Sequence, residues 1–186
     1  MKERNLAVII LAAGKGTRMK SKMSKVTHKL AGRPVIGHLL ETIESMLPQQ
    51  IITVISDEKS DVAEIAANTT VALQNFPLGT GHAAAAALPL LKNKFFQEVL
   101  VVFGDTPFLT VETIERMLEI LRGPDEPAIV VLGFRPPIAI EYGRLVTDGS
   151  GRLEKIVEAR DASPSILQID LCNAGIMAFD GARFPD

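Results

Sequence analysis

The sequence is poor in cysteine and has no excess of either charge, and these scarcities exclude several classes of protein. Its 186 residues hold 20 Lys and Arg against 22 Asp and Glu, a formal net charge of -2 at pH 7. Without a basic field the chain has no general attraction for a nucleic-acid backbone, so any anion must be met by local groups. The single cysteine, Cys172, cannot form an internal disulfide. Its apolar surroundings predict a buried, inert thiol, which suits a cytoplasmic protein.

Long hydrophobic runs are missing as well. No apolar stretch approaches the roughly 20 residues that a membrane-spanning helix needs, because Lys92 and Lys94 close the longest alanine-rich segment. The apolar run 6–13 superficially resembles a signal peptide, but Gly14-Lys15-Gly16 stands where a cleavage site would be. We therefore expect no membrane partner. Repeats, low-complexity tracts and clear linkers are also lacking, so we expect a single domain over residues 1–186.

What the sequence does have is an alternation of apolar runs with helical periods, within a composition that is 47% hydrophobic. This pattern predicts strands at 6–11, 51–55, 70–73, 99–103 and 128–134, and helices at 34–46, 58–66, 80–91 and 110–121. It favours an α/β fold with a Rossmann-like, mostly parallel sheet flanked by helices. Further along, strands at 144–146 and 153–157 flank Asp148-Gly149-Ser150-Gly151, which predicts a β-hairpin insertion before a last strand at 174–179.

The first predicted strand runs into the loop 11–19, which reads Leu-Ala-Ala-Gly-Lys-Gly-Thr-Arg-Met. Ligands of open α/β sheets bind at the carboxyl ends of the strands. Glycines let backbone N–H groups approach phosphate oxygens, and Lys15, Arg18 and Lys25 supply positive charge. The loop is not a P-loop, and Met19 stands where a dinucleotide fingerprint needs its third glycine. A solvated connection without a ligand is the alternative interpretation.

More motifs follow this loop in order and span almost the whole chain. They are Gln74 with Leu78-Gly79-Thr80-Gly81-His82-Ala83, Gly104-Asp105-Thr106-Pro107, Tyr142-Gly143-Arg144, Ile156-Val157-Glu158 and Asn173-Ala174-Gly175. The set resembles the sugar-phosphate nucleotidyltransferases, and within them the uridyltransferase domain of bacterial bifunctional uridyltransferase/acetyltransferases. This resemblance implies a fold of the nucleotide-diphospho-sugar transferase type. It also implies transfer of uridylyl from UTP to N-acetylglucosamine 1-phosphate, which gives pyrophosphate and UDP-N-acetylglucosamine, a precursor of peptidoglycan and lipopolysaccharide.

The resemblance also implies roles for individual residues. Arg18 and Lys25 would be the catalytic cations. The nucleotide would be bound by Leu11, Ala12, Ala13, Gly14, Lys25, Gln74, Gly79, Thr80, Phe103, Gly104 and Asp105. Asp105 would hold Mg²⁺ together with phosphate oxygens, as Mg²⁺ sites commonly do. Gly143, Glu158 and Asn173 would contact the sugar.

The motifs on the nucleotide side also have purely structural interpretations. Gln74 can be a solvated loop residue, Gly79 to Gly81 a helix start, and Asp105 the cap of a turn. The histidines show no metal-like spacing, and His82 is expected to pack in its helix.

The motifs on the sugar side have such interpretations too. Glu158 can pair with Arg160 at the surface, and Asn173 can cap a bend before the last strand. Two other functions also stay open, a noncatalytic fragment that binds a nucleotide sugar and a related nucleotidyltransferase that uses CTP or GTP.

The resemblance sets expectations for the extent of the protein. In the family the domain continues past the position of Asp186 to an asparagine that completes the magnesium site, so we expect an incomplete domain. The acetyltransferase half, which forms the trimer in the relatives, has no counterpart in this sequence. A homotrimer is therefore expected only where that half is present.

Overall fold

The computed structural model describes residues 4–14, 16, 19, 21, 23–58 and 60–184. Two compact units make up the chain: residues 1–130 with 177–186 form the first, and residues 131–176 form the second. Within the described ranges, no helix has both the length and the apolar character needed to cross a membrane.

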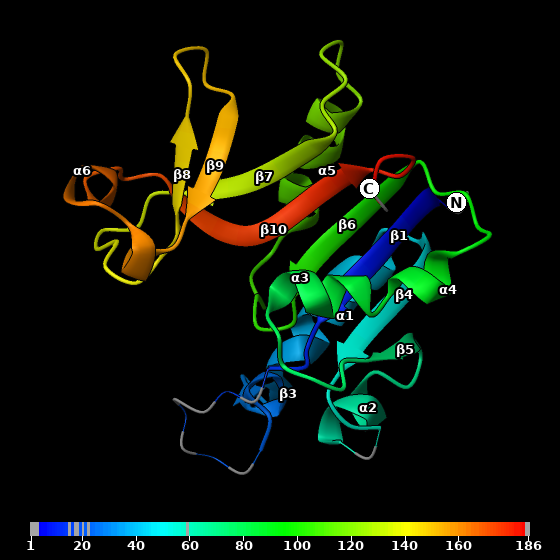
Figure 1. The fold of residues 1–186 in the computed structure, drawn as a ribbon. Coiled ribbons are helices and arrows are strands. Elements are labelled where there is room, and N and C mark those ends of the chain that lie inside the picture. Colours follow the sequence, from blue (N-terminus) through cyan, green and yellow to red (C-terminus); the bar gives the residue numbers. More distant parts are fainter. Residues whose placement is uncertain are drawn as a thin grey trace. The chain divides into compact units, whose positions relative to one another are not determined.

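A mostly parallel sheet forms the centre of the first unit. It contains β1 (Arg4–Leu11), β4 (Pro48–Ile55), β5 (Thr70–Leu73) and β6 (Glu98–Phe103). The strands lie in the order β5-β4-β1-β6, all parallel, as Figure 1 shows. The last residues of β10 (Cys172–Asp180) add an antiparallel neighbour to β6. The predicted fold class is confirmed.

Helices cover both faces of this sheet because its central strand is apolar on both sides. The side chains from Leu6 to Ile10 are fully buried, and they alternate between the two faces. Ala7 and Ile9 belong to a core cluster with residues of α3 (Thr80–Ala85) and α4 (Leu88–Leu91). The amphipathic helices α1 (Val35–Ser45) and α5 (Val111–Leu121) lie behind the sheet in the view of Figure 1.

The predicted helix 80–91 is interrupted between α3 and α4. Pro89 lies in the first turn of α4. In a continuous helix its ring would clash with the carbonyl of Ala85, and it has no N–H to donate. The prediction was therefore wrong at this point. The predicted helix 58–66 is also shorter, since α2 (Asp61–Ile65) starts after its N-cap Ser60, whose side chain accepts from the N–H of Ala63 at 3.3 Å.

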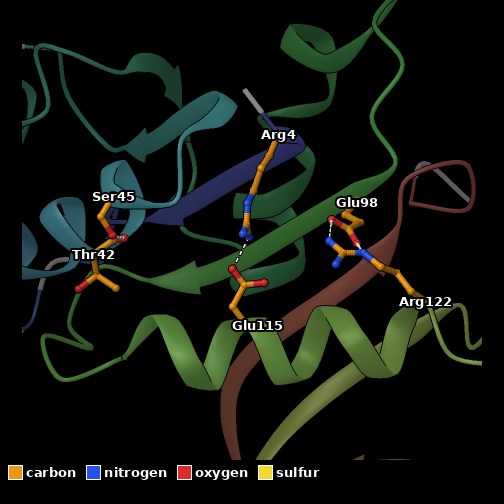
Figure 2. Close-up of polar contacts among 6 residues, drawn as sticks. All are labelled: Arg4, Thr42, Ser45, Glu98, Glu115 and Arg122. Atoms are coloured by element: carbon orange, nitrogen blue, oxygen red, sulfur yellow. Dashed lines mark hydrogen bonds and ion pairs between the residues drawn. The ribbon is translucent and has the colours of Figure 1, made fainter. Parts of the chain in front are cut away.

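Two ion pairs fix α5 to the sheet, as Figure 2 shows. Glu115 pairs with Arg4 of β1. Arg122, just after the helix, pairs with both carboxylate oxygens of Glu98 at 2.5 and 2.8 Å. Only 6% of Glu98 is exposed. This hydrogen-bonded carboxylate raises the pKa of Arg122, so the guanidinium stays charged.

The second unit is built on the predicted hairpin. β8 (Arg144–Thr147) and β9 (Leu153–Val157) pair antiparallel, and β8 also pairs with the start of β10. Asp148 organises the turn, because its Oδ1 accepts from the N–H and hydroxyl of Ser150 at 2.8 and 2.7 Å, and from the N–H of Arg152 at 2.9 Å. These hydrogen bonds, that from the Ser150 hydroxyl first, lower the pKa of Asp148.

The rest of this unit surrounds the hairpin. The strand β7 (Ile129–Phe134) leads into it, and its Phe134 ring meets Tyr142 edge to face with the centroids 4.9 Å apart. Two short elements, the 3₁₀ turn η3 (Ala159–Asp161) and α6 (Pro164–Leu167), were not predicted. Cys172 is fully buried with a free thiol, as predicted.

Candidate functional site

The carboxyl ends of the parallel strands bring three separate loops to one edge of the first unit. Leu11 lies opposite both Val54 and Phe103 in the sheet. Backbone hydrogen bonds continue this order past the strand ends, from Ala12 N to Val54 O at 2.8 Å and from Gly104 N to Leu11 O at 2.9 Å. The first loop and the Gly104 turn therefore leave the sheet side by side.

A pocket of about 630 Å³ opens at this edge. It is lined by Leu11, Ala12, Ala13, Gly14, Gly16, Met19, Lys25, Val26, Gln74, Pro77, Gly79, Thr80, Ala83, Phe103 and Asp105. All but one of the described residues predicted for the nucleotide are in this lining. The exception is Gly104, which is buried beside it: a Cβ there would lie 3.3 Å from both Ala12 Cβ and Val26 Cγ1.

Five lining residues were not predicted, namely Gly16, Met19, Val26, Pro77 and Ala83. Four of them lie in or beside the motifs that carried the prediction, so adjacency to those motifs is a signal that could have found them. Val26 follows Lys25 and begins a 3₁₀ turn, η2 (Lys25–Thr27), that the sequence did not predict. Its buried side chain supplies an apolar part of the pocket wall.

Lys25 and Asp105 form an ion pair inside this pocket, although 80 positions separate them in sequence. The Lys25 side chain is 48% exposed and that of Asp105 is 29% exposed. An ion pair that is this open to solvent contributes only about 0–1 kcal/mol to stability. The turn after β6 is instead closed by Thr106, whose hydroxyl donates to Phe103 O at 2.6 Å. The side chain of Thr106 therefore holds the turn, and the carboxylate of Asp105 faces the pocket instead of capping the turn.

Gln74 reaches the same pocket from the end of β5 and is held in place. Its backbone N–H donates to Ile55 O at 2.8 Å. The side chain is buried, and its Nε2 donates to Gly79 O at 3.1 Å and lies 3.2 Å from His82 Nδ1. The interpretation of Gln74 as a solvated loop residue was wrong. His82 lies in α3, but it is exposed there, so the expectation that it packs was wrong. Its Nδ1 contacts the Gln74 amide.

Gly16 brings the first loop close to Lys25. Its φ is +55°, and a Cβ there would lie only 2.6 Å from Lys25 Cβ. Only glycine adopts this conformation without strain and allows so close an approach. The predicted catalytic residue Arg18 and the cation Lys15 of the same loop lie outside the described residues.

The residues predicted to contact the sugar lie together in the second unit. Asn173 N donates to Gly143 O at 2.8 Å, and a Cβ at Gly143 would lie 3.3 Å from Glu158 Oε1. Asn173 Oδ1 also accepts from Gly175 N at 2.8 Å, but Asn173 lies within β10 and does not cap a bend before it, so that structural alternative was wrong. Arg160 pairs with Asp161 at 3.3 Å. The alternative interpretation, in which Arg160 pairs with Glu158, was therefore wrong.

The pocket holds only part of the donor set that a Mg²⁺ ion needs. Asp105 is the only carboxylate in the described lining. No group of three His, Cys, Asp or Glu side chains that could hold a metal occurs within residues 4–14, 16, 19, 21, 23–58 and 60–184. Mg²⁺ is commonly bound by one or two carboxylates plus substrate phosphates. The residues therefore fit an ion that arrives with a triphosphate and do not form a complete protein site.

A second depression of similar volume lies between α1 and the start of α5. Among the described residues, its lining carries two carboxylates, Glu41 and Glu112, and no basic residue. The hydrogen bond from its own backbone N–H lowers the pKa of Glu112, which keeps that carboxyl ionised. Glu41 is already paired with Arg33, and the described lining offers a triphosphate no cation, so this depression is not a candidate nucleotide site.

Comparison with known proteins agrees with the fold and with these motifs. The chain is 48% identical to the Bifunctional protein GlmU of Paramagnetospirillum magneticum over 98% of its own length, and 47% identical to that of Rhodospirillum rubrum over 94%. It spans about 40% of the length of these relatives. A solved structure of a CMP:2-keto-3-deoxy-manno-octonic acid synthetase complexed with CTP superposes with a TM-score of 0.71 at 15% identity, over 97% of this chain and 76% of the other. Residues 8–149 match the model of the MobA-like NTP transferase domain. The chain therefore belongs to the MobA-like NTP transferase domain family.

Proposed function

We propose that this protein transfers uridylyl from UTP to N-acetylglucosamine 1-phosphate and releases pyrophosphate. The observation that carries the proposal is the pocket in which Lys25, Asp105 and Gln74 lie together at the carboxyl edge of the sheet. It offers a cation for the phosphates, a carboxylate for a metal ion that accompanies them, and an amide for the base. The choice of uridine and of this sugar rests on three sets of motifs. They are the first loop, the segment from Leu78 to Ala83, and the motifs that contain Gly143, Glu158 and Asn173. UDP-N-acetylglucosamine would be the product, made in the cytoplasm.

In the proposed reaction an oxygen of the sugar phosphate attacks the α-phosphorus of UTP in line. The bond from that phosphorus to the β-phosphate oxygen breaks, and pyrophosphate leaves with the electron pair. No covalent protein intermediate forms, so the protein contributes positioning and charge neutralisation.

Lys25 acts as a positive charge and not as a base. At about 4 Å and an effective dielectric near 20, one charge pair is worth roughly 4 kcal/mol. The same lysine already meets Asp105, which shows that its Nζ can reach an anion at this position. We propose that Arg18 of the first loop shares this role.

Asp105 is the residue that would hold Mg²⁺, and oxygens of the substrate phosphates would supply further ligands. A bound ion would neutralise charge on the phosphates of the substrate. In the second unit, Gly143, Glu158 and Asn173 would hydrogen-bond the sugar, since a carboxylate and an amide suit its hydroxyl and acetamido groups.

The proposal is tested by pyrophosphate release with UTP, Mg²⁺ and a panel of sugar 1-phosphates. N-acetylglucosamine 1-phosphate should give the highest rate. Lys25→Ala should abolish most of the turnover, whereas Lys29→Ala, which removes an exposed lysine outside the pocket, should leave it unchanged. Equal rates for both variants would remove Lys25 from the reaction. Turnover with CTP or GTP in preference to UTP would assign the chain to another nucleotide.

Binding without turnover is the second candidate, and one observation favours it. The described part of the pocket offers a single carboxylate to a metal ion. Calorimetry with UDP-N-acetylglucosamine separates the two functions: binding without any pyrophosphate release supports the second, and pyrophosphate release supports the first.

A further inference from the structure

The Gln74 side chain is fixed in one orientation by two neighbours. Its Nε2 lies 3.1 Å from Gly79 O and 3.2 Å from His82 Nδ1. A backbone carbonyl only accepts hydrogen bonds, so the amide atom that faces Gly79 must be the NH₂ group. If the amide were flipped, its oxygen would face the carbonyl oxygen, which is repulsive.

The same geometry assigns the protonation of His82. Since Nδ1 faces an NH₂ group, it must be the accepting nitrogen of a neutral ring, and the proton is then on Nε2. The two hydrogens of Gln74 Nε2 are thereby directed at two acceptors. The amide oxygen, Oε1, is the atom that a ligand in the pocket can use.

We infer that His82 is a positioning residue that sets the orientation of the Gln74 amide, and through it the preference of the pocket for a base with an N–H at its edge. This inference rests on the proposed function, in which Gln74 meets the base. His82 itself is exposed and is not part of the pocket lining. It acts on the ligand only through Gln74.

The chemistry distinguishes uracil from cytosine, which has nearly the same shape. At N3 uracil carries an N–H, which donates to an amide oxygen, whereas cytosine carries a lone pair, which repels it. A flipped amide would reverse this preference. Gly79 O and His82 Nδ1 both oppose the flip, so loss of one of them should weaken the discrimination without abolishing it.

The test compares the dissociation constants of UTP and CTP for the wild-type chain and for three variants. His82→Phe keeps a ring but has no acceptor, and His82→Ala removes the ring in a residue type that suits a helix. His82→Asn places an amide oxygen near the former position of Nδ1, so it serves as the conservative control. One net hydrogen bond corresponds to a change in affinity of about two- to twelvefold.

We expect the ratio of the CTP to the UTP dissociation constant to fall about three- to tenfold in His82→Phe and His82→Ala. His82→Asn should keep the wild-type ratio. A general structural role of His82 would instead weaken both nucleotides equally and leave the ratio unchanged, which overturns the inference. Equal behaviour of His82→Asn and His82→Phe also overturns it. A wild-type chain that does not prefer UTP refutes the uridine preference in the proposed function, and with it this inference. A ratio that stays at the wild-type value in His82→Phe and His82→Ala refutes the inference alone.

Discussion

Gly16 offers the sharpest test of the geometry of the first loop, because Gly14 in the same loop serves as its control. Replacement of Gly16 by alanine introduces two penalties. A φ of +55° is unfavourable for an L residue, and the new Cβ would lie 2.6 Å from Lys25 Cβ. At Gly14 a Cβ meets no atom of a described residue within 4 Å, and the φ of Gly14 is not in the left-handed region.

The pair of variants isolates the strain in the folded state. Each glycine-to-alanine change restricts the unfolded chain by a similar amount, about 0.4–1 kcal/mol in favour of the folded state, and this contribution cancels in the comparison. The left-handed conformation costs alanine about 1–2 kcal/mol. Movement of Lys25 away from the new methyl group adds to this cost. Gly16→Ala should therefore be less stable than Gly14→Ala by about 1–2 kcal/mol or somewhat more.

The measurement is thermal unfolding followed by circular dichroism without nucleotide. For a chain of this size, 1 kcal/mol shifts the unfolding midpoint by about 2–4 °C, so Gly16→Ala should unfold roughly 2–8 °C below Gly14→Ala. Equal midpoints, or a higher midpoint for Gly16→Ala, would show that Gly16 does not adopt this conformation next to Lys25.

Three further predictions concern charges. Arg122→Ala leaves the buried Glu98 carboxylate without its partner, so chemical denaturation should show a loss of about 1–3 kcal/mol, against less than about 0.5 kcal/mol for Arg160→Ala in the exposed pair. Because the pKa of Asp148 is lowered, its contribution to the turn is complete above the ordinary carboxyl pKa of 3.8 and is lost as the pH falls through the lower folded value. An NMR titration of this carboxyl should therefore give a midpoint below 3.8, and a midpoint at or above 3.8 would contradict the turn hydrogen bonds. Lys25→Ala should lower kcat for pyrophosphate release far more than it raises the KM for the sugar phosphate, and a change in KM alone would contradict a role for Lys25 in the transition state.

The sheet was predictable because its central strands are buried on both faces. Such strands appear in the sequence as short continuous apolar runs, and β1 and β6 lie within two residues of their predicted bounds. The hairpin of the second unit was predictable from its turn residues, since Asp148 accepts the three hydrogen bonds that close the turn. Local chemistry determines both features.

Elements without a full period of their own escaped prediction. The strands β2 (Lys29–Leu30) and β3 (Arg33–Pro34) have two residues each, and α6 has four. Segments of this length show neither a strand alternation nor a helical period. The break before α4 was missed for a different reason: the alanine-rich composition of 80–91 outweighed the signal of Pro89, although a proline inside a helical pattern usually ends or kinks the helix.

The candidate site shows the same division between local and long-range information. The motifs indicated which residues surround the pocket, because each motif follows a strand end and the parallel ends meet at one edge. They did not indicate which side chains pair within it. The contact between Lys25 and Asp105 joins residues 80 positions apart, and that between Gln74 and His82 depends on the direction of a helix relative to a strand. Such pairings follow from tertiary geometry and not from residue type.

The Lys25–Asp105 pair contributes little to the stability of the fold, so we attribute its position to the function of the pocket. Arg122 pairs with a carboxylate whose side chain is 8% exposed, where loss of the partner leaves a buried charge and is costly. Asp105 is 29% exposed and Lys25 48%, so solvent can replace either partner at little cost. A fold that needed only rigidity would gain little from this pair. In the proposed function, an incoming triphosphate with its counter-ion would separate the two charges, because the phosphates would attract Lys25 and the cation would attract Asp105.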